Sequence, residues 1–159
     1  QVMDYKIRTI RESEYSLLKD FLYEAIFVPE GVPAPSRSII NRPELQIYIT
    51  DFGKREDDIG LVAEIDKKVI GLVWGRIMND YGHIDNDTPS LAIALYKDYR
   101  GLGIGTDLMK EMLRIVRFRG YKQASLAVQK ENYAIKLYQK IGFVIVNENE
   151  EEYIMLCHF

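Results

Sequence analysis

The sequence predicts a single mixed α/β domain, residues 1–159, built on a mostly antiparallel sheet. A chain of 159 residues suits one domain, and 47% hydrophobic residues are enough to form a core. Strand-like and helical runs follow one another in the order strand, helix, loop, three or more strands, helix, strand, helix, two strands. Because several strands follow one another without an intervening helix, most strand pairs are expected to be antiparallel.

The N-terminal part begins with a strand and a helix. Side chains alternate over residues 5–10, and apolar residues recur at helical spacing over residues 17–25, with Ser13 placed to cap that helix. Residues 29–43 hold four of the five prolines, which predicts a structured loop with at most a short helix near residues 36–41. Long loops in compact domains are often functional, so we expect this segment to contact a substrate.

The middle of the chain is rich in strands. Residues 59–65 and 69–78 are β-rich, and the turn at residues 66–68 joins them into a hairpin. A polar loop over residues 79–88 precedes a further apolar strand at residues 91–95.

The C-terminal part alternates helices and strands. From Ile104 an apolar stripe recurs at helical spacing, and Gly120 ends that helix. The remaining elements are, in order, a strand at 124–128, a helix at 132–141 that Gly142 ends, and strands at 143–146 and 153–156.

Charge and hydropathy exclude several classes of partner. The net charge is −3, and the one basic cluster is most simply a solvated helix face, so nucleic acid is not an expected partner. No apolar run approaches the roughly 18 residues of a membrane span, and charged residues interrupt the start of the chain, so no signal peptide is predicted. We therefore expect a cytoplasmic monomer or homodimer with no membrane partner.

Cysteine and histidine are too scarce for metal or disulfide chemistry. Cys157 is the single cysteine, so neither an intrachain disulfide nor a thiolate cluster can form. His83 and His158 are far apart in the sequence, and no metal site is predicted. Cys157 lies near the end of an apolar strand, so we expect it in the core rather than as a nucleophile.

Three glycines alternate where a predicted strand gives way to a helix. Gly101, Gly103 and Gly105 allow backbone to approach a ligand closely and to adopt φ > 0. The free N–H groups of the first helical turn and the helix dipole attract anions, and Arg100 adds a positive charge. A pyrophosphate fits such a site.

This turn alone has competing interpretations. A Walker nucleotide loop would place a lysine after the last glycine, where Thr106 stands. A dinucleotide fingerprint needs a third glycine at that position and belongs in the first βα unit, whereas this turn lies past the middle of the chain. A tight turn without any ligand also remains open on this motif alone.

A second motif downstream makes the glycine-rich turn a more specific signal than it is alone. Residues 99–105, Tyr-Arg-Gly-Leu-Gly-Ile-Gly, resemble the Arg/Gln-x-x-Gly-x-Gly/Ala signature of the GNAT acetyltransferase superfamily, and residues 132–143 resemble its second signature. The resemblance is clear over residues 91–143, and the preceding elements fit more loosely. It implies an N-acetyltransferase whose co-substrate is acetyl-CoA.

The resemblance also implies where acetyl-CoA binds. The sheet should have helices on both faces and be splayed between its fourth and fifth strands, with the pantetheine arm paired to fourth-strand backbone. The pyrophosphate should meet N–H groups from Leu102 to Asp107. The residues implied in coenzyme binding are Ala94, Leu95, Tyr96, Arg100, Gly101, Leu102, Gly103, Ile104, Gly105, Thr106, Asp107, Asn132 and Tyr138.

The chemistry needs a proton for the leaving thiolate and a base for the amine. The resemblance implies Tyr138 as the general acid, although its helical spacing suits a core aromatic equally well, and a backbone N–H near Leu95 as the group that polarises the thioester carbonyl. Asn132 departs from the family spacing by one residue, and Ala127 stands where some members carry a glutamate. The candidate bases are His83, Asp85 and Asp87, which a solvated turn explains more simply, or a water relay.

The resulting hypothesis is direct transfer of an acetyl group from acetyl-CoA to a primary amine of a small molecule or peptide in a ternary complex. Loops 24–42 and 79–88 are expected to select the acceptor. The alternatives are a non-catalytic acyl-CoA-binding module, which would bind CoA without turnover, and an interaction domain with no CoA affinity.

Overall fold

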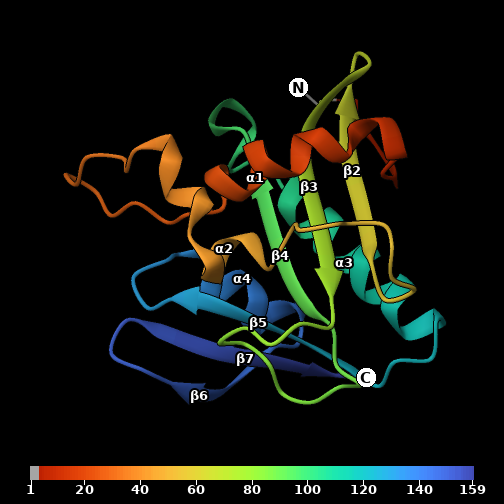
Figure 1. Ribbon diagram of the computed structural model, residues 1–159, viewed down its shortest axis with the longest axis vertical. Helices are drawn as coiled ribbons and strands as arrows, with labels where there is room; N and C mark the ends of the chain where they lie inside the picture. The colour runs from red at the N-terminus through yellow and green to blue at the C-terminus, as the bar shows by residue number, and fades with distance from the viewer. Residues whose placement is uncertain (1–3) are drawn as a thin grey trace.

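The computed structural model describes residues 4–159 as one sheet flanked by helices (Figure 1). None of the helices in this range combines the length and the apolar character that crossing a bilayer requires. The principal elements are β1 (Lys6–Thr9), α1 (Leu18–Glu24), α2 (Pro43–Gln46), β2 (Ile59–Ile65), β3 (Lys68–Arg76), β4 (Ser90–Leu95), α3 (Ile104–Phe118), β5 (Gln123–Gln129), α4 (Ala134–Ile141), β6 (Val144–Glu148) and β7 (Glu152–His158). Short 3-10 helices cover Glu12–Leu17, Arg37–Asn41 and Lys97–Tyr99.

The seven strands run in the order β1-β2-β3-β4-β5-β7-β6. Every neighbouring pair is antiparallel except β4 and β5, which are parallel. The β5-β7-β6 part turns away from the β1-β2-β3-β4 part (Figure 1). The predicted mixed α/β class, the antiparallel majority and the splay between the fourth and fifth strands are confirmed.

Two cores lie on the two faces of the sheet, because side chains alternate along each strand. Leu61 and the opposite Val73 pack with α3, whereas Val62 and Leu72 pack with α1. Figure 1 shows α1 in front of the sheet and α3 behind it. Strands buried on both faces explain why β2 and β3 are apolar with little polar alternation.

The first predicted helix is divided in the structure. Residues 12–17 form a 3-10 helix and α1 starts only at Leu18. Ser13 lies inside the 3-10 helix instead of capping it; the Arg11 N–H donates to the Glu14 carboxylate (2.9 Å) at its start. The short helix expected near residues 36–41 is present, with Ser36 accepting a hydrogen bond from the Ser38 N–H (3.4 Å).

A buried ion pair holds α2 and the turn after it against the sheet. Arg76 at the end of β3 donates to both carboxylate oxygens of Asp58, at 2.8 and 3.0 Å, and both side chains are almost fully buried. The same guanidinium donates to the carbonyls of Ile47 (3.2 Å) and Thr50 (2.7 Å). The indole N–H of Trp74 donates to the Tyr48 carbonyl (3.0 Å). These bonds fix the position of the backbone that carries Tyr48.

Candidate functional site

The two halves of the sheet part after a single residue pair between β4 and β5. Ser90 pairs with Ser125, and the Ser125 N–H donates to the Pro89 carbonyl (3.0 Å). Within residues 4–159, the ladder between these strands contains no further pair. The rest of the β4 edge therefore presents backbone donors and acceptors to whatever enters the splay.

The register of β4 decides which of its residues face this splay. The Tyr96 N–H donates to the Ile70 carbonyl of the β3 segment (3.0 Å). Hydrogen-bonded positions alternate along an antiparallel pair, so Ala94 and Tyr96 direct their backbone groups to β3. Ile93 and Leu95 direct theirs into the splay. Of the three β4 positions named from the sequence, only Leu95 offers backbone to a ligand there, and Ile93 joins it.

The glycine-rich turn has the conformation that its sequence suggests. Gly101 and Gly103 have φ of 74° and 88°, in the left-handed region, and a Cβ added at either would meet no atom within 4 Å. Gly105 lies inside α3 with no such φ, and a Cβ there would lie 3.3 Å from Cδ1 of Leu95. The turn is thus open to a ligand, and α3 approaches the end of β4 closely.

The first turn of α3 carries the expected unfilled donors. The Asp107 N–H makes the first intrahelical bond, to the Gly103 carbonyl (3.2 Å). N–H groups of residues 104–106 precede that bond and have no helical acceptor. Asp107 differs from its prediction, because its N–H is used by the helix and its carboxylate accepts a hydrogen bond from the Tyr5 hydroxyl.

Arg100 lies beside this turn and links two elements. Its Nε donates to the Leu95 carbonyl (2.9 Å) and its Nη2 to the Glu24 carbonyl (3.2 Å) and carboxylate (3.3 Å). The guanidinium is half-exposed. It therefore presents a positive charge at the turn while tying the end of α1 to the end of β4.

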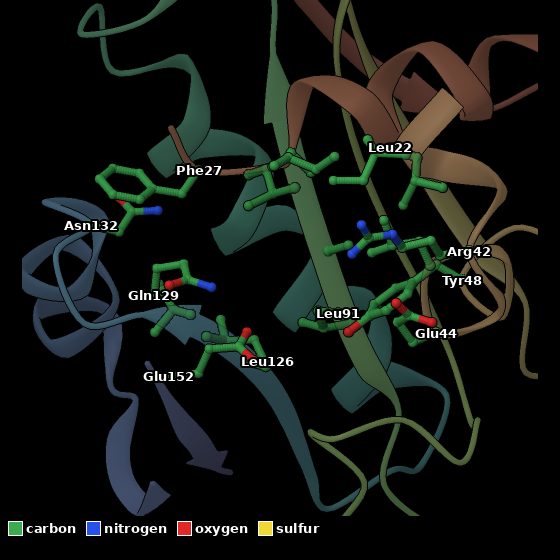
Figure 2. Close-up of a pocket in the computed structure, with 18 of the residues that line it drawn as sticks. Leu22, Phe27, Arg42, Glu44, Tyr48, Leu91, Leu126, Gln129, Asn132 and Glu152 are labelled. Carbon is green, nitrogen blue, oxygen red and sulfur yellow. The ribbon is translucent and has the colours of Figure 1, made fainter. Parts of the chain in front are cut away.

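Two cavities meet in the splay. The turn-side cavity, about 590 Å³, includes Arg100, Gly105 and Leu95 in its wall. The α2-side cavity, about 330 Å³, includes Leu45 and Tyr48 in its wall (Figure 2). The residues shared by both walls are Ala25, Ile26, Phe27, Ile93, Asn132 and Tyr138.

Tyr138 stands at this junction. It is 7% exposed, and its ring packs edge-on against Phe143 with 5.9 Å between ring centroids. Among the described residues its hydroxyl has no hydrogen-bond partner, yet it is not a fully enclosed polar atom either, so it reaches the cavity surface. Burial raises the pKa of Tyr138 to about 12, which keeps the phenol protonated at neutral pH. Tyr138 is thus a core aromatic whose protonated hydroxyl faces the cavities.

Asn132 also reaches the junction, with part of its side chain already used. Its Oδ1 accepts a hydrogen bond from the Ala134 N–H (2.9 Å) at the start of α4. Figure 2 shows it beside Phe27 and above Gln129. Its amide nitrogen is the group left for a ligand.

The three candidate bases before the fourth strand stay outside the site. Asp85 accepts hydrogen bonds from the Asp87 N–H (2.8 Å) and the Thr88 hydroxyl (2.7 Å), and these bonds lower its pKa. His83 contacts the Met78 carbonyl through Nδ1 (2.8 Å). Neither they nor Asp87 belong to the walls of the two cavities in the described part of the chain.

Glu152 is a wall residue that sequence reasoning missed. The predicted strands 143–146 and 153–156 leave Glu152 in the connection between them, but Glu152 is the first residue of β7 and lines the α2-side cavity (Figure 2). Burial, followed by the charges of Glu151 and Asp80, raises the pKa of its carboxyl. No local pattern could have found it, because the cavity wall forms only when β7 pairs with β5.

The proline-rich segment 29–43 borders both cavities. Val32 and Pro35 line the turn-side cavity, whereas Ile39 and Arg42 line the α2-side cavity. The second loop expected to select an acceptor, residues 79–88, contributes to neither wall. Its Asp80 instead accepts a hydrogen bond from the Tyr48 hydroxyl (2.8 Å) and so supports the α2-side cavity from behind.

Comparison with known proteins agrees with this arrangement. Residues 21–143 match the model of the acetyltransferase (GNAT) family. The chain is 31% identical to an N-alpha-acetyltransferase of Sulfurisphaera tokodaii, over 96% of this chain and 92% of that protein. It is 35% identical over 83 residues to a probable N-acetyltransferase, camello, of Xenopus laevis, which is 52% of this chain but only 36% of the relative's length.

Solved structures share the whole fold at low sequence identity. The PaiA N-acetyltransferase of Thermoplasma acidophilum, in complex with coenzyme A, superposes with a TM-score of 0.73 at 20% identity, covering 99% of this chain and 100% of that one. A putative streptothricin acetyltransferase of Bacillus anthracis, in complex with acetyl coenzyme A, gives 0.67 at 20% identity, with 99% of both chains covered.

Proposed function

Because this chain belongs to the GNAT family of acetyltransferases, we propose that it transfers an acetyl group from acetyl-CoA to a primary amine by direct transfer in a ternary complex. The observation that carries the proposal is the meeting of two cavities at Tyr138 and Ile93. One cavity has Arg100 and Gly105 of the glycine-rich turn in its wall, and the wall of the other contains no residue of that turn. Two substrates can therefore approach one point from opposite sides.

Acetyl-CoA is assigned to the turn-side cavity. The N–H groups of residues 102–106 and the charge of Arg100 suit the pyrophosphate. The backbone groups of Ile93 and Leu95 suit the two amides of the pantetheine arm, because an unpaired strand edge offers matching donors and acceptors. The Leu95 carbonyl already accepts a hydrogen bond from Arg100 (2.9 Å), so its second lone pair is the one left for an amide of the arm.

The reaction follows from these positions. The amine in the α2-side cavity attacks the thioester carbon, and a β4 N–H stabilises the oxyanion that forms. The C–N bond forms, the C–S bond breaks, and the Tyr138 hydroxyl gives its proton to the departing sulfur. The nitrogen has then to lose a proton, which returns Tyr138 to its neutral state. No acyl-enzyme is needed, and Cys157 is buried away from both cavities with a pKa raised by burial.

A panel of amines with acetyl-CoA, read by release of the CoA thiol, tests the proposal. The panel should include polyamines, amino acids, aminoglycosides and peptides with a free N-terminus; the similarity to an N-alpha-acetyltransferase is the reason for the last group. We expect turnover with at least one class. CoA binding without turnover on the whole panel would instead favour the alternative, a non-catalytic acyl-CoA-binding module.

A further inference from the structure

Glu152 has a defined place on one wall of the α2-side cavity. It pairs with Gln129 across β5 and β7, and Ala127 pairs with Ile154 two positions further along. Directly opposite residues share a sheet face, as do residues two apart in one strand. Glu152, Gln129 and Ala127 therefore lie on one face, and all three line the cavity.

The carboxylate of Glu152 is not used by the fold. Its neighbour Glu148 pairs with Lys130 (2.9 Å), and Asp80 accepts hydrogen bonds from Tyr48 and Ser90 (2.8 and 3.0 Å). Within residues 4–159 no ion pair and no side-chain hydrogen bond involves the Glu152 carboxylate. Only its backbone is engaged, in the turn that Asn149 stabilises by accepting its N–H (2.7 Å).

The surroundings of Glu152 make it a better base than an ordinary carboxylate. The titratable and charged groups around it are Glu151 beside it, Asp80 behind the cavity, and Tyr48, Glu44 and Arg42 on the α2 side of the cavity. Burial is the largest influence and raises its pKa, and the two nearby acids act in the same direction. Glu44 also lines the cavity but is exposed, so water competes there for its lone pairs.

We propose that Glu152 is the general base of the reaction and accepts a proton from the ammonium group of the acceptor, directly or through one water. This inference rests on the proposed function. An amine arrives at neutral pH mostly as R-NH3+, which has no lone pair for attack. Transfer of one proton to Glu152 leaves R-NH2, which forms the C–N bond; the second proton lost by nitrogen restores the Tyr138 phenol after it protonates the sulfur. Glu152 then releases its proton to solvent, so one proton is produced per amide formed.

The test compares Glu152→Gln with Glu151→Gln. Both remove one negative charge from neighbouring positions, but the exposed Glu151 lines neither cavity. With the best amine of the panel, Glu152→Gln should lower kcat at pH 7 by about 10²-fold or more, the range for a lost acid–base group, while CoA affinity is unchanged. Glu151→Gln should stay within about twofold of the parent.

The pH profile separates a base from a merely structural residue. In Glu152→Gln only acceptor that is already neutral can react, so kcat/KM should rise about tenfold per pH unit up to the pKa of the amine. In the parent, kcat/KM should level off at a lower pH than in Glu152→Gln, once Glu152 is ionised. A parallel profile for both proteins, or a kcat of Glu152→Gln within about threefold of the parent, would overturn the inference and leave the proposed function intact.

A relocated carboxylate gives a second, independent readout. Glu152→Ala should be as slow as Glu152→Gln. Adding Ala127→Glu to Glu152→Ala should raise kcat at least tenfold, because both positions lie on one face of the same cavity wall. If the double variant binds CoA normally yet remains as slow as Glu152→Ala, the role as a proton acceptor is contradicted. A parent enzyme that binds CoA but acetylates nothing would overturn both proposals.

Discussion

At the scale of single residues, Tyr138 is both a core aromatic and a residue of the cavity walls, and its helical spacing in the sequence fits either position. Its ring belongs to the core beside Phe143, and its hydroxyl reaches the junction of two cavities. Burial raises its pKa to about 12, so the hydroxyl carries its proton at neutral pH, as the proposed role of general acid requires. The hydroxyl reaches the cavity surface without a protein partner among the described residues, so a ligand in the cavity can use it.

Tyr138→Phe should lower kcat by roughly 10²-fold or more while leaving the fold and CoA affinity largely intact, because it removes one oxygen and little volume. Measurements of kcat at saturating acetyl-CoA, with CoA binding measured separately, check this. Tyr121→Phe is the control, since Tyr121 is a partly buried tyrosine that lines neither cavity. Equal rates for the two variants would make Tyr138 a core residue only.

Gly103→Val should abolish CoA binding. The substitution adds branched carbon to open space where the phosphates are expected, and it forces a side chain into φ of 88°. Gly120→Val is the control: Gly120 has φ of 95° at the other end of α3, also with open space around an added Cβ. Both variants should lose similar stability, and calorimetric titration should show CoA binding only in Gly120→Val. Loss of binding in both would attribute the effect to the strained helix rather than to the turn.

At the scale of elements, the Arg76–Asp58 pair determines where the α2 wall lies. Asp58→Asn should cost about 3–5 kcal/mol of unfolding free energy, because it leaves a buried guanidinium without its counter-charge. Since Arg76 also holds the carbonyls of Ile47 and Thr50, the same variant should raise the KM for the amine more than the Kd for CoA. Urea unfolding and steady-state kinetics measure the two effects.

The pH dependence of this effect has a definite sign. Burial favours the neutral acid, but the hydrogen bonds and charge of Arg76 outweigh it and lower the pKa of Asp58 below its ordinary value. The pair therefore contributes its full stability above the unfolded pKa of about 3.9 and loses it as pH falls through the lower folded value. The difference in unfolding free energy between the parent and Asp58→Asn should therefore shrink as the pH is lowered from 5 through the folded pKa of Asp58. A difference that stays constant with pH would mean that packing, not charge, supplies the stability.

The observed helix boundaries show which local sequence signals were sufficient to predict a helix and its ends. The stripe that begins at Ile104 predicted a helix to Gly120, and α3 covers 104–118 with six of its eight apolar residues buried. The N-terminal helix was predicted less well: apolar spacing located α1, but the capping position was wrong because Glu14 is used by Arg8 and by the Arg11 N–H. An ion pair between a strand residue and the 3-10 helix that follows it is not visible in the spacing of apolar residues.

At the scale of the whole molecule, the two halves of the sheet are joined in the β4–β5 ladder by one residue pair, and a ligand lying in the splay would contact both. CoA should therefore raise the melting temperature. A ligand that binds only the folded state at 100 times its Kd contributes about 2.7 kcal/mol, which is several degrees for a domain of this size. A melting curve unchanged by millimolar CoA would contradict the coenzyme assignment, and Gly103→Val supplies the matched negative control.

The sequence by itself determined the class of fold, most of the elements and the glycine-rich turn, and it named Tyr138 as the general acid, which stays a prediction. These depend on the spacing of apolar residues, on the φ that glycine permits and on motifs within a few residues, all of which are local properties. Only the tertiary structure decided that Ile93 and Leu95, not Ala94 and Tyr96, face the splay, and that Glu152 enters the cavity while Asp85 does not. Those facts depend on strand register and on the pairing of β5 with β7, in which a shift of one residue would turn every side chain to the opposite face. Register is set by packing between distant segments, so it cannot be found in any single stretch of sequence.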